Sequence, residues 1–524
     1  MAEKPPIATR VVFLVMLIAG LSYVAYSLRS DVSSVGEVLH LGVFALLGLA
    51  LLIALGFEFV NGFHDTANAV ATVIYTHSLP PVVAVVWSGC FNFLGVLTSS
   101  GAVAYTIVTL LPVELILQVG NTAGYAMIFA LLLAAIIWNL GTWWLGIPNS
   151  SSHALIGSVM GVGLANQLMA PAGQATSGVD WGQAQNVFNA LLWSPVMGFF
   201  LAGALLLIMK FLVRAPALYQ EPKADAAPPW WIRGLLILTC TGVSFAHGSN
   251  DGQKGMGLIM LILIGAAPTA YALNRTMADA SMPAFEAHAQ AAQAVFTAKA
   301  AGAPTVTVDQ AHEVVGNALR TKSVDKPVVY AALATITGDI SAQVQTYHSL
   351  KLVPAAATPN LRNDMYLVGD ALRILTKSKT AKLDKPTQAT LSAFMGDMQA
   401  GTRFIPTWVK VGVAIALGLG TMVGWKRIVV TVGEKIGKTH LTYAQGAAAE
   451  LVAAATIMTA DSLHLPVSTT HILSSGVAGT MAANGSGLQA RTLISIASAW
   501  VLTLPAAILL AGGLYWLLRT VTGG

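Results

Sequence analysis

The chain has 524 residues, of which 55% are hydrophobic and only 10% are charged, and its formal net charge is +5. A soluble protein would carry about 25% charged residues, so this composition excludes a soluble globular protein and predicts a polytopic membrane protein surrounded by lipid. The small basic excess fits loops that orient membrane helices and does not indicate a nucleic-acid partner. The two cysteines, Cys90 and Cys240, lie in apolar runs, so neither a disulfide framework nor a thiolate metal site is expected.

The apolar runs indicate the helices of this membrane protein. The first run, residues 11–28, follows Lys4 and Arg10, and it fits either a signal peptide or a first helix. Because no clear small-residue cleavage pattern follows it, we predict a retained helix. Further spans are predicted at 39–60 (continuing as a short helix to 76), 82–111, 124–147, 150–169 and 187–213, and then at 230–246 (continuing to 270), 405–425, 442–463, 468–485 and 492–517.

Basic residues in the short loops indicate that the two sets of five spans are inverted. Residues 112–123 contain no Lys or Arg, whereas the corresponding loop, 426–440, contains four. Since Lys and Arg in short loops mark the cytoplasmic side, the two loops are predicted to face opposite sides of the membrane. The connector 214–229 is predicted to be cytoplasmic, and an odd number of spans per repeat then inverts the second copy.

The predicted fold class is an all-α polytopic membrane protein with two inverted five-span repeats, broken helices, an extra N-terminal helix and a long polar insertion. Span counting places the insertion outside the cell, and a homodimer is compatible with such a fold. The predicted parts are the N-terminal helix and linker 1–38, the first transport repeat 39–213, the cytoplasmic connector 214–229, the second transport repeat 230–270 and 405–517, and the extramembrane insertion 271–404.

Two similar segments carry acids at the ends of apolar runs. Residues 247–255 align with residues 61–69 of the segment 56–72, with Asp65 matching Asp251 at an offset of 186 residues. A carboxylate at membrane depth costs about 2.5 to 3.5 kcal/mol, so acids there indicate ion or substrate sites. Each segment is predicted to join an apolar helix to a glycine-interrupted turn, as in transporters built from repeats. The candidates for cation binding or proton coupling are Asp65, Asp251, Glu450, Glu58, His64, Asn250, Asn61 and Lys254, and the candidate metal ligands are Asp65 and Asp251.

A second pair of segments places hydroxyl groups at helix starts. Pro148–His153 and Pro466–His471 both have a proline five residues before a histidine. The N-terminus of a helix offers unpaired N–H groups and a partial positive charge, which suit a tetrahedral oxyanion. Ser and Thr also simply cap helices, but two such turns at equivalent places favour a ligand site. The candidate phosphate-binding residues are Ser150, Ser151, Ser152, Ser468, Thr469, Thr470, Asn68 and Gln253.

Glu450 and Lys254 stand out among the remaining charged residues. Glu450 is a lone acid in an alanine-rich helix and is the strongest proton-carrier candidate after the two aspartates. Lys254 takes the position of Asn68, and its ammonium would either neutralise substrate charge or occupy a cation site permanently. No two histidines stand at helical spacing near the carboxylates, so imidazole ligation of a metal is not favoured. The sequence contains no phosphate-cradling nucleotide loop, so ATP hydrolysis is not expected.

These segments resemble the inorganic phosphate transporter family, Pit type, and in particular its bacterial low-affinity branch. The resemblance extends over residues 39–265 and 404–517. It implies import of inorganic phosphate across the bacterial cytoplasmic (inner) membrane by ion-coupled symport, usually with protons and with phosphate carried as a complex with a divalent, magnesium-type metal. The segments that carry it are 61–72, 138–143, 148–153, 247–255, 442–446 and 466–471.

The resemblance also implies roles by position. Asp65 and Asp251 would lie at the cation sites, the two hydroxyl turns at the phosphate, and Glu450 on the transport path. The family's commoner signature is altered by His64 in the first segment and by the pair 253–254, Gln-Lys, in the second. These departures bear on the sodium site of sodium-coupled relatives.

The leading hypothesis is import of a metal–phosphate complex with protons by alternating access. Co-transported sodium is the alternative coupling ion, and a phosphate sensor that binds without net flux is an alternative function. An intramembrane phosphatase is disfavoured because the helix ends lack the arginines that phosphoryl transfer generally needs, so no enzyme is expected. No cofactor is expected apart from the co-transported ions.

Overall fold

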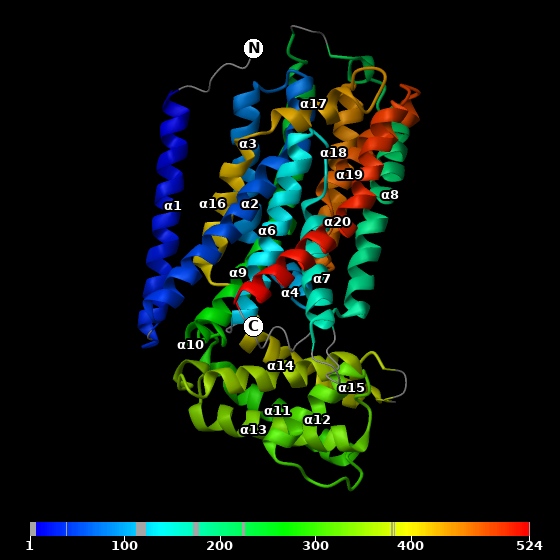
Figure 1. Cartoon of the computed structure of the whole chain (residues 1–524). Coiled ribbons are helices and arrows are strands. Elements are labelled where there is room, and N and C mark those ends of the chain that lie inside the picture. Colours follow the sequence, from blue (N-terminus) through cyan, green and yellow to red (C-terminus); the bar gives the residue numbers. More distant parts are fainter. Residues whose placement is uncertain are drawn as a thin grey trace.

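The computed structural model of the chain describes residues 7–37, 39–111, 122–170, 178–222, 226–378, 381 and 383–522, without the side chains of residues 8, 9, 66–68, 122 and 123. The described residues form helices and turns with no strand, apart from a single bridge between Gly437 and Leu488. Figure 1 shows a bundle of long helices with a smaller group of helices at one end. The predicted all-α membrane fold is therefore confirmed.

The helices fall into three groups along the chain. Those before the connector are α1 (Ile7–Ser34), α2 (Leu41–Tyr75), α3 (Pro81–Thr98), α4 (Ala102–Val108), α6 (Thr122–Trp144), α7 (Ser151–Leu168) and α8 (Trp181–Leu212), followed by the 3-10 turn η1 (Pro216–Tyr219). Those after it in the bundle are α9 (Trp230–Ala266), α10 (Pro268–Tyr271), α16 (Thr407–Thr421), α17 (Lys426–Glu434), α18 (Tyr443–Ser462), α19 (Thr469–Asn484) and α20 (Ala490–Thr522). The insertion contains η2 (Asp279–Ser281), α11 (Met282–Lys299), α12 (Val308–Arg320), α13 (Pro327–Tyr347), η3 (Leu350–Leu352), α14 (Thr358–Leu375) and α15 (Lys385–Thr402).

Six of the described helices are long and apolar enough to cross a membrane: α1 from Arg10, α2, α3, α6 from Gly124, α8 and α20. A seventh is counted if α15 and α16, which meet at 69°, form one broken span. Helices α7, α9, α18 and α19 do not meet this criterion, because α19 is short and the others carry many polar residues. They nevertheless lie within the bundle (Figure 1).

The interruptions predicted at the two aspartate segments are wrong, because α2 and α9 run through them as unbroken helices. Their glycines serve close packing instead. A Cβ atom at Gly62 would lie 2.2 Å from Leu417 O, and one at Gly248 would lie 2.1 Å from Asn92 O. Small residues let helix backbones approach this closely in membranes, so these glycines determine the distance of α2 from α16 and of α9 from α3.

The breaks in the bundle lie elsewhere. Residues 145–150 separate α6 from α7, and residues 463–468 separate α18 from α19. The single span predicted at 82–111 is also wrong, because α3 ends at Thr98 and the chain turns before α4. Gly101 has a φ of 85° at this turn, a left-handed conformation that favours glycine.

Helix packing follows a pattern that is preserved when the two halves are exchanged. Helix α2 packs on α16 as α9 packs on α3, and α7 packs on α20 as α19 packs on α8. Each pair joins a helix before the connector to one after it. The close glycine contacts repeat as well, since a Cβ atom at Gly420 would lie 2.1 Å from Phe59 O and one at Gly95 would lie 2.2 Å from Phe245 O. This exchange supports the predicted repeats, and their inversion stays a prediction.

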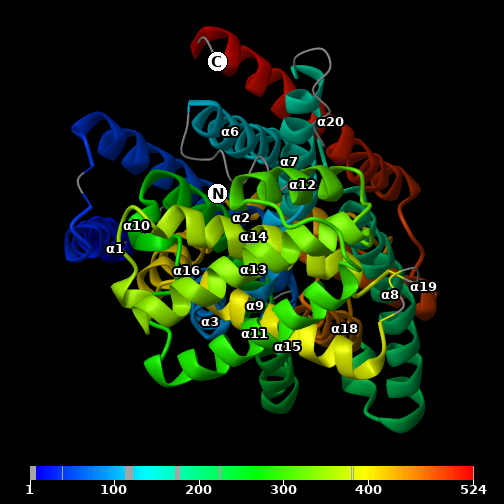
Figure 2. The same ribbon diagram turned by 90° about the horizontal axis from the view of Figure 1, so that it is seen from below.

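The insertion forms a helical domain with its own apolar core. Phe285, Phe296, Leu333 and Phe394 are fully buried in it. It lies at the end of the bundle opposite the connector between the halves (Figure 1), and Figure 2 shows its helices covering that end. Because the connector is predicted to be cytoplasmic, the insertion lies at the end that is predicted to face outward.

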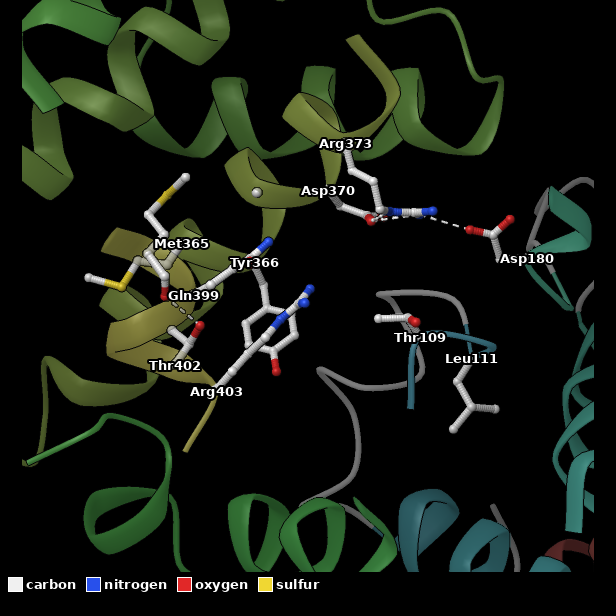
Figure 3. Close-up of a pocket in the computed structure, with 12 residues that line it drawn as sticks. Thr109, Leu111, Asp180, Met365, Tyr366, Asp370, Arg373, Gln399, Thr402 and Arg403 are labelled. Atoms are coloured by element: carbon white, nitrogen blue, oxygen red, sulfur yellow. Dashed lines mark hydrogen bonds and ion pairs between the residues drawn. The ribbon is translucent and has the colours of Figure 1, made fainter. Parts of the chain in front are cut away.

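A salt bridge joins the insertion to the bundle. Arg373 on α14 donates from Nη2 to Asp180 Oδ2 at 2.8 Å and lies 2.7 Å from Asp370 Oδ1. Asp180 also caps α8, because its Oδ1 accepts a hydrogen bond from the Gly182 N–H at 3.0 Å. Figure 3 shows Arg373 and Asp370 on one side of a pocket that Asp180 and Arg403 also line. The first turn of α8 is thus attached to the insertion.

Replacing Gly62 by alanine is expected to destabilise the bundle, because the new Cβ atom would collide with the Leu417 backbone. We expect a loss of about 1 to 3 kcal/mol, as for overpacked cores, seen as a lower melting temperature of the detergent-purified protein. Gly56→Ala is the matched control on the same helix, since nothing lies within 4 Å of its Cβ position. Equal melting temperatures for the two variants would contradict the packing role of Gly62.

Candidate functional site

The two hydroxyl turns lie together inside the bundle. The ring centroids of His153 and His471 are 4.5 Å apart, and His471 also stacks on Trp500 at 4.0 Å. Ser150 caps α7 by accepting a hydrogen bond from the His153 N–H at 3.2 Å, and Ser468 caps α19 through the His471 N–H at 3.2 Å. Two segments far apart in the sequence therefore bring two helix N-termini together with the same local geometry.

Ser151 and Thr469, which follow the two caps, have unpaired hydroxyls. Both oxygens are buried and have no hydrogen-bond partner among the described residues. The first N–H groups of each helix also lack an intrahelical partner. A buried polar group left unsatisfied costs about 1 to 3 kcal/mol, and an anion at the helix N-termini would satisfy these groups. The two turns thus offer matched sets of donors, one at the start of α7 and one at the start of α19.

Asp65 on α2 is buried against the second hydroxyl turn. Its Oδ1 accepts a hydrogen bond from Thr470 Oγ1 at 2.7 Å and lies 3.1 Å from His64 Nδ1. The other ring nitrogen of His64 lies 3.3 Å from Thr142 Oγ1 on α6. An aspartate of the first half is therefore held by a hydroxyl of the second half. The side chain of Asn68, a further candidate on α2, lies outside the described residues.

Asp251 and Lys254 on α9 form a charged counterpart to this arrangement. Both side chains are fully buried. Lys254 Nζ donates to Asp251 Oδ1 at 2.6 Å, to Val467 O at 3.2 Å and to Ser152 Oγ. Ser152 Oγ in turn donates to Val467 O at 2.8 Å. The lysine therefore connects the aspartate of the second half to the hydroxyl turn of the first half.

His247 joins the two aspartates, and sequence reasoning missed this third group. One side-chain atom from each of Asp65, His247 and Asp251 lies within 4.8 Å of the other two. His247 Nδ1 lies 2.8 Å from Asn92 Oδ1, an acceptor that favours the proton on Nδ1 and leaves a lone pair on Nε2. That Nε2 lies 3.5 Å from Asp251 Oδ2, and neither atom has a hydrogen-bond partner in the described part of the chain.

These three side chains form a candidate site for a divalent cation, since carboxylate oxygens and imidazole nitrogens are common metal ligands. The spacing of His247 and Asp251, four residues apart on α9, is the sequence signal for this cluster. Residues at that spacing share one face of a helix. The third ligand, Asp65, comes from α2, which packs against α9.

Asn250 and Gln253 contact other parts of the bundle. Asn250 Oδ1 accepts a hydrogen bond from the Val467 N–H at 3.4 Å, so it braces the segment before α19. Gln253 Oε1 accepts from the Val103 N–H at 2.9 Å, and its Nε2 donates to Asp461 Oδ1 at 2.6 Å. Because both ends of the Gln253 amide are used away from the hydroxyl turns, no contact supports its predicted phosphate-binding role.

The two other predicted acids are fully buried at separate places. Glu58 Oε2 accepts a hydrogen bond from Asn61 Nδ2 at 3.4 Å, and its carboxyl packs against the backbone of Gly255, next to Lys254. Glu450 Oε2 accepts from Thr239 Oγ1 at 2.6 Å. Thr239 precedes the aspartate of α9 by about 18 Å along the helix axis, so Glu450 lies away from the central cluster.

The fold and this centre are those of a helical membrane transporter. Two helix N-termini, two aspartates and a buried lysine meet inside a bundle of membrane-length helices. Buried charges at such places mark the paths of substrates and ions, and acids beside helix N-termini in interrupted regions are typical of secondary transporters.

Comparison with known proteins identifies the kind of transporter. The profile of the phosphate transporter family matches residues 61–511, and the chain belongs to this family. The low-affinity inorganic phosphate transporters PitA and PitB of Escherichia coli K12 are 43% and 41% identical to it, over 91% of this chain and 97% and 98% of theirs. A probable low-affinity inorganic phosphate transporter of Bacillus subtilis is 29% identical over 90% of this chain and 97% of its own. A solved structure described as the sodium-dependent phosphate transporter has a TM-score of 0.49 and 21% identity, covering 91% of this chain and 100% of that one.

The family resemblance inferred from the sequence motifs is therefore confirmed. The chain is an integral membrane protein that transports phosphate. Its relatives are named as transporters rather than as enzymes, which agrees with the expectation from the helix ends.

Proposed function

We propose that this transporter imports phosphate across the bacterial cytoplasmic membrane as a complex with a divalent metal, coupled to protons, by alternating access. The observation that carries the proposal is the meeting of the two hydroxyl turns with Asp65, His247 and Asp251 in one region of the bundle. The polar side chains of this region are at most 9% exposed. A centre closed to both sides is what the occluded intermediate of alternating access requires.

The two helix N-termini supply the phosphate site of this proposal. The hydroxyls of Ser151 and Thr469 and the first N–H groups of α7 and α19 are neutral donors. Neutral donors lack the net positive charge that an arginine cluster would add to its hydrogen bonds with phosphate, so they allow release of the anion. The partial positive charge of each helix N-terminus adds to the attraction.

Replacing both Ser151 and Thr469 by alanine is expected to raise the KM for phosphate. A hydrogen bond to a charged group contributes about 1.5 to 3 kcal/mol, so each lost hydroxyl is expected to raise KM about tenfold or more. The measurement is uptake of labelled phosphate into proteoliposomes. Ser158→Ala is the matched control on α7, because that hydroxyl bonds the Ala154 carbonyl at 2.8 Å. An unchanged KM in the folded double variant would remove these hydroxyls from the phosphate site.

The cluster of Asp65, His247 and Asp251 suits a divalent metal carried with phosphate as substrate. A divalent cation and hydrogen phosphate together carry no net charge, so moving the pair through a buried centre avoids the high cost of an isolated charge. Carboxylate oxygens suit magnesium, and the imidazole extends the set to ions such as manganese and zinc.

Replacing His247 by glutamine is expected to weaken metal binding, because it removes one of the three ligands. We expect the affinity for Mn²⁺ to fall about tenfold, which is the lower end of the range seen when residues around a bound metal are replaced. The affinity is measured by titrating the purified protein with Mn²⁺ and following free Mn²⁺ by EPR. His288→Gln is the control, since that imidazole pairs with Asp397 in the insertion at 2.6 Å. Equal Mn²⁺ affinities for the two variants would exclude His247 as a ligand.

Asp65→Asn and Asp251→Asn are expected to abolish coupled uptake in protein that still inserts.

Glu450 is the candidate proton carrier outside the centre. Its carboxyl is fully buried, its Oε2 accepts a hydrogen bond from Thr239, and its Oε1 has no partner among the described residues. A buried acid of this kind in a membrane helix is typical of proton relays. Glu58, whose carboxyl packs against Gly255, is a second candidate.

Replacing Glu450 by glutamine is expected to uncouple transport, because an amide does not release a proton. Accumulation of labelled phosphate driven by an inward proton gradient with magnesium should be lost, while exchange of internal for external phosphate continues. Both are measured in proteoliposomes. If the wild-type protein accumulates phosphate under an inward sodium gradient but not under a proton gradient, the coupling ion is sodium, which is the alternative hypothesis. Phosphate binding without flux under either gradient would favour a sensor.

A further inference from the structure

We propose that Lys254 is a permanent cation in the second of two related cation sites, so that each phosphate is carried with one mobile cation fewer than two symmetric sites would bind. The inference rests on the proposed ion-coupled transport. It concerns the stoichiometry of that coupling, which membership of the family does not determine.

The Lys254 ammonium occupies a site built from oxygen atoms. Its Nζ donates to the Asp251 carboxylate at 2.6 Å, to the Val467 carbonyl at 3.2 Å and to the Ser152 hydroxyl. Val467 belongs to the interrupted segment before α19, and carbonyls of such segments hold small cations in transporters. A carboxylate, a carbonyl and a hydroxyl are also the oxygen ligands that hard cations prefer. The ammonium thus lies where a small bound cation would lie.

The first half of the chain offers a related site without a fixed ammonium. Asp65 matches Asp251 in the aligned segments, and it accepts a hydrogen bond from Thr470 of the hydroxyl turn in the other half. The position of Lys254 is taken there by Asn68, which is neutral. The two halves therefore have matching acids and matching hydroxyl turns, but only the second has a lysine at this position.

Charge balance connects this difference to stoichiometry. A carboxylate buried in the membrane part is unfavourable unless a positive charge balances it, and that charge comes either from the protein or from a bound ion. Lys254 balances Asp251 from within the protein, and it is fully buried with it. If the lysine charge is removed, the centre has one positive charge fewer. One further cation then has to bind to give the phosphate-loaded centre the same net charge as in the wild-type protein.

A purely bracing role for Lys254 would produce the same contacts, because the side chain also connects α9 to the start of α7. The two roles predict different effects of removing the charge while the side chain keeps its length. Loss of a brace changes the stability of the protein and the rate of transport. Loss of a permanent cation changes the number of ions that move with each phosphate.

The test measures this number for Lys254→Met, which retains an unbranched side chain without the charge. Labelled phosphate is followed to steady state in potassium-free proteoliposomes, over a series of proton or sodium gradients, with the membrane potential held at zero by a permeant anion. The steady accumulation ratio varies as the nth power of the gradient when n cations move with each phosphate. We expect n to rise by one, so that a gradient of about tenfold produces about tenfold more accumulation in the variant than in the wild type.

Lys410→Met is the matched control, because Lys410 is another lysine of the bundle, on α16, and its Nζ donates to Ser99 O at 2.7 Å. Its n is expected to equal that of the wild type. An n that is also unchanged in Lys254→Met would overturn the inference while leaving ion-coupled transport intact. If the wild type itself accumulates no phosphate under either gradient, the proposed coupling fails, and the inference fails with it.

If Lys254→Met proves inactive, Lys254→Ala decides the question through chemical rescue. The alanine variant leaves room beside Asp251 for a small cation. Ammonium, methylammonium or sodium added on both sides is expected to restore phosphate exchange in this variant, with a dependence on the added cation that the wild type lacks. No restoration by any of these cations would show that the lysine does more than supply a charge, and would overturn the inference.

Discussion

Asp65 and Asp251 lie inside the membrane part with 4% and 0% of their surfaces exposed, and the need to satisfy these two carboxylates from within the protein organises the bundle. Since lipid offers no partner for a buried charge, the partners have to come from other helices. Thr470 reaches Asp65 from the second half, and Lys254 connects Asp251 to the hydroxyl turn of the first half. Each acid is therefore connected to the hydroxyl turn of the other half, directly for Asp65 and through Lys254 for Asp251, so the centre forms only when both halves are folded together.

Glycine residues and the interrupted segments allow the two halves to approach closely enough for these contacts to form. Gly62 and Gly248 let α2 and α9 lie against the backbones of α16 and α3, which keeps their polar faces close together inside the bundle. The segments 145–150 and 463–468 let α7 and α19 begin within the protein rather than at its surface. The unpaired N–H groups at these helix starts are then sheltered from water, where their attraction for an anion is strongest.

The insertion adds a second level of organisation at one end of the bundle. Its apolar core shows that it packs as a unit, and one of its contacts with the bundle is the salt bridge of Arg373 with Asp180 at the start of α8. Helix α8 packs along α19, whose N-terminus is one of the two hydroxyl turns. Through α8, the insertion is thus connected to one of the two hydroxyl turns of the proposed phosphate site.

The sequence by itself determined the membrane class, the position of most helices, the two pairs of matching segments and the family, because all of these depend on local composition and on motifs of neighbouring residues. It did not determine whether the glycines of α2 and α9 form a turn or allow close helix packing, because glycine is common in both. The neighbouring helices α16 and α3 show that these glycines allow close packing. The tertiary structure alone brought Asp65 to His247 and Asp251, and it alone distinguished the hydroxyls that cap helices from those without a hydrogen-bond partner. These outcomes depend on contacts such as that of Thr470 with Asp65, 405 residues apart in the chain, and no local pattern contains such a distance.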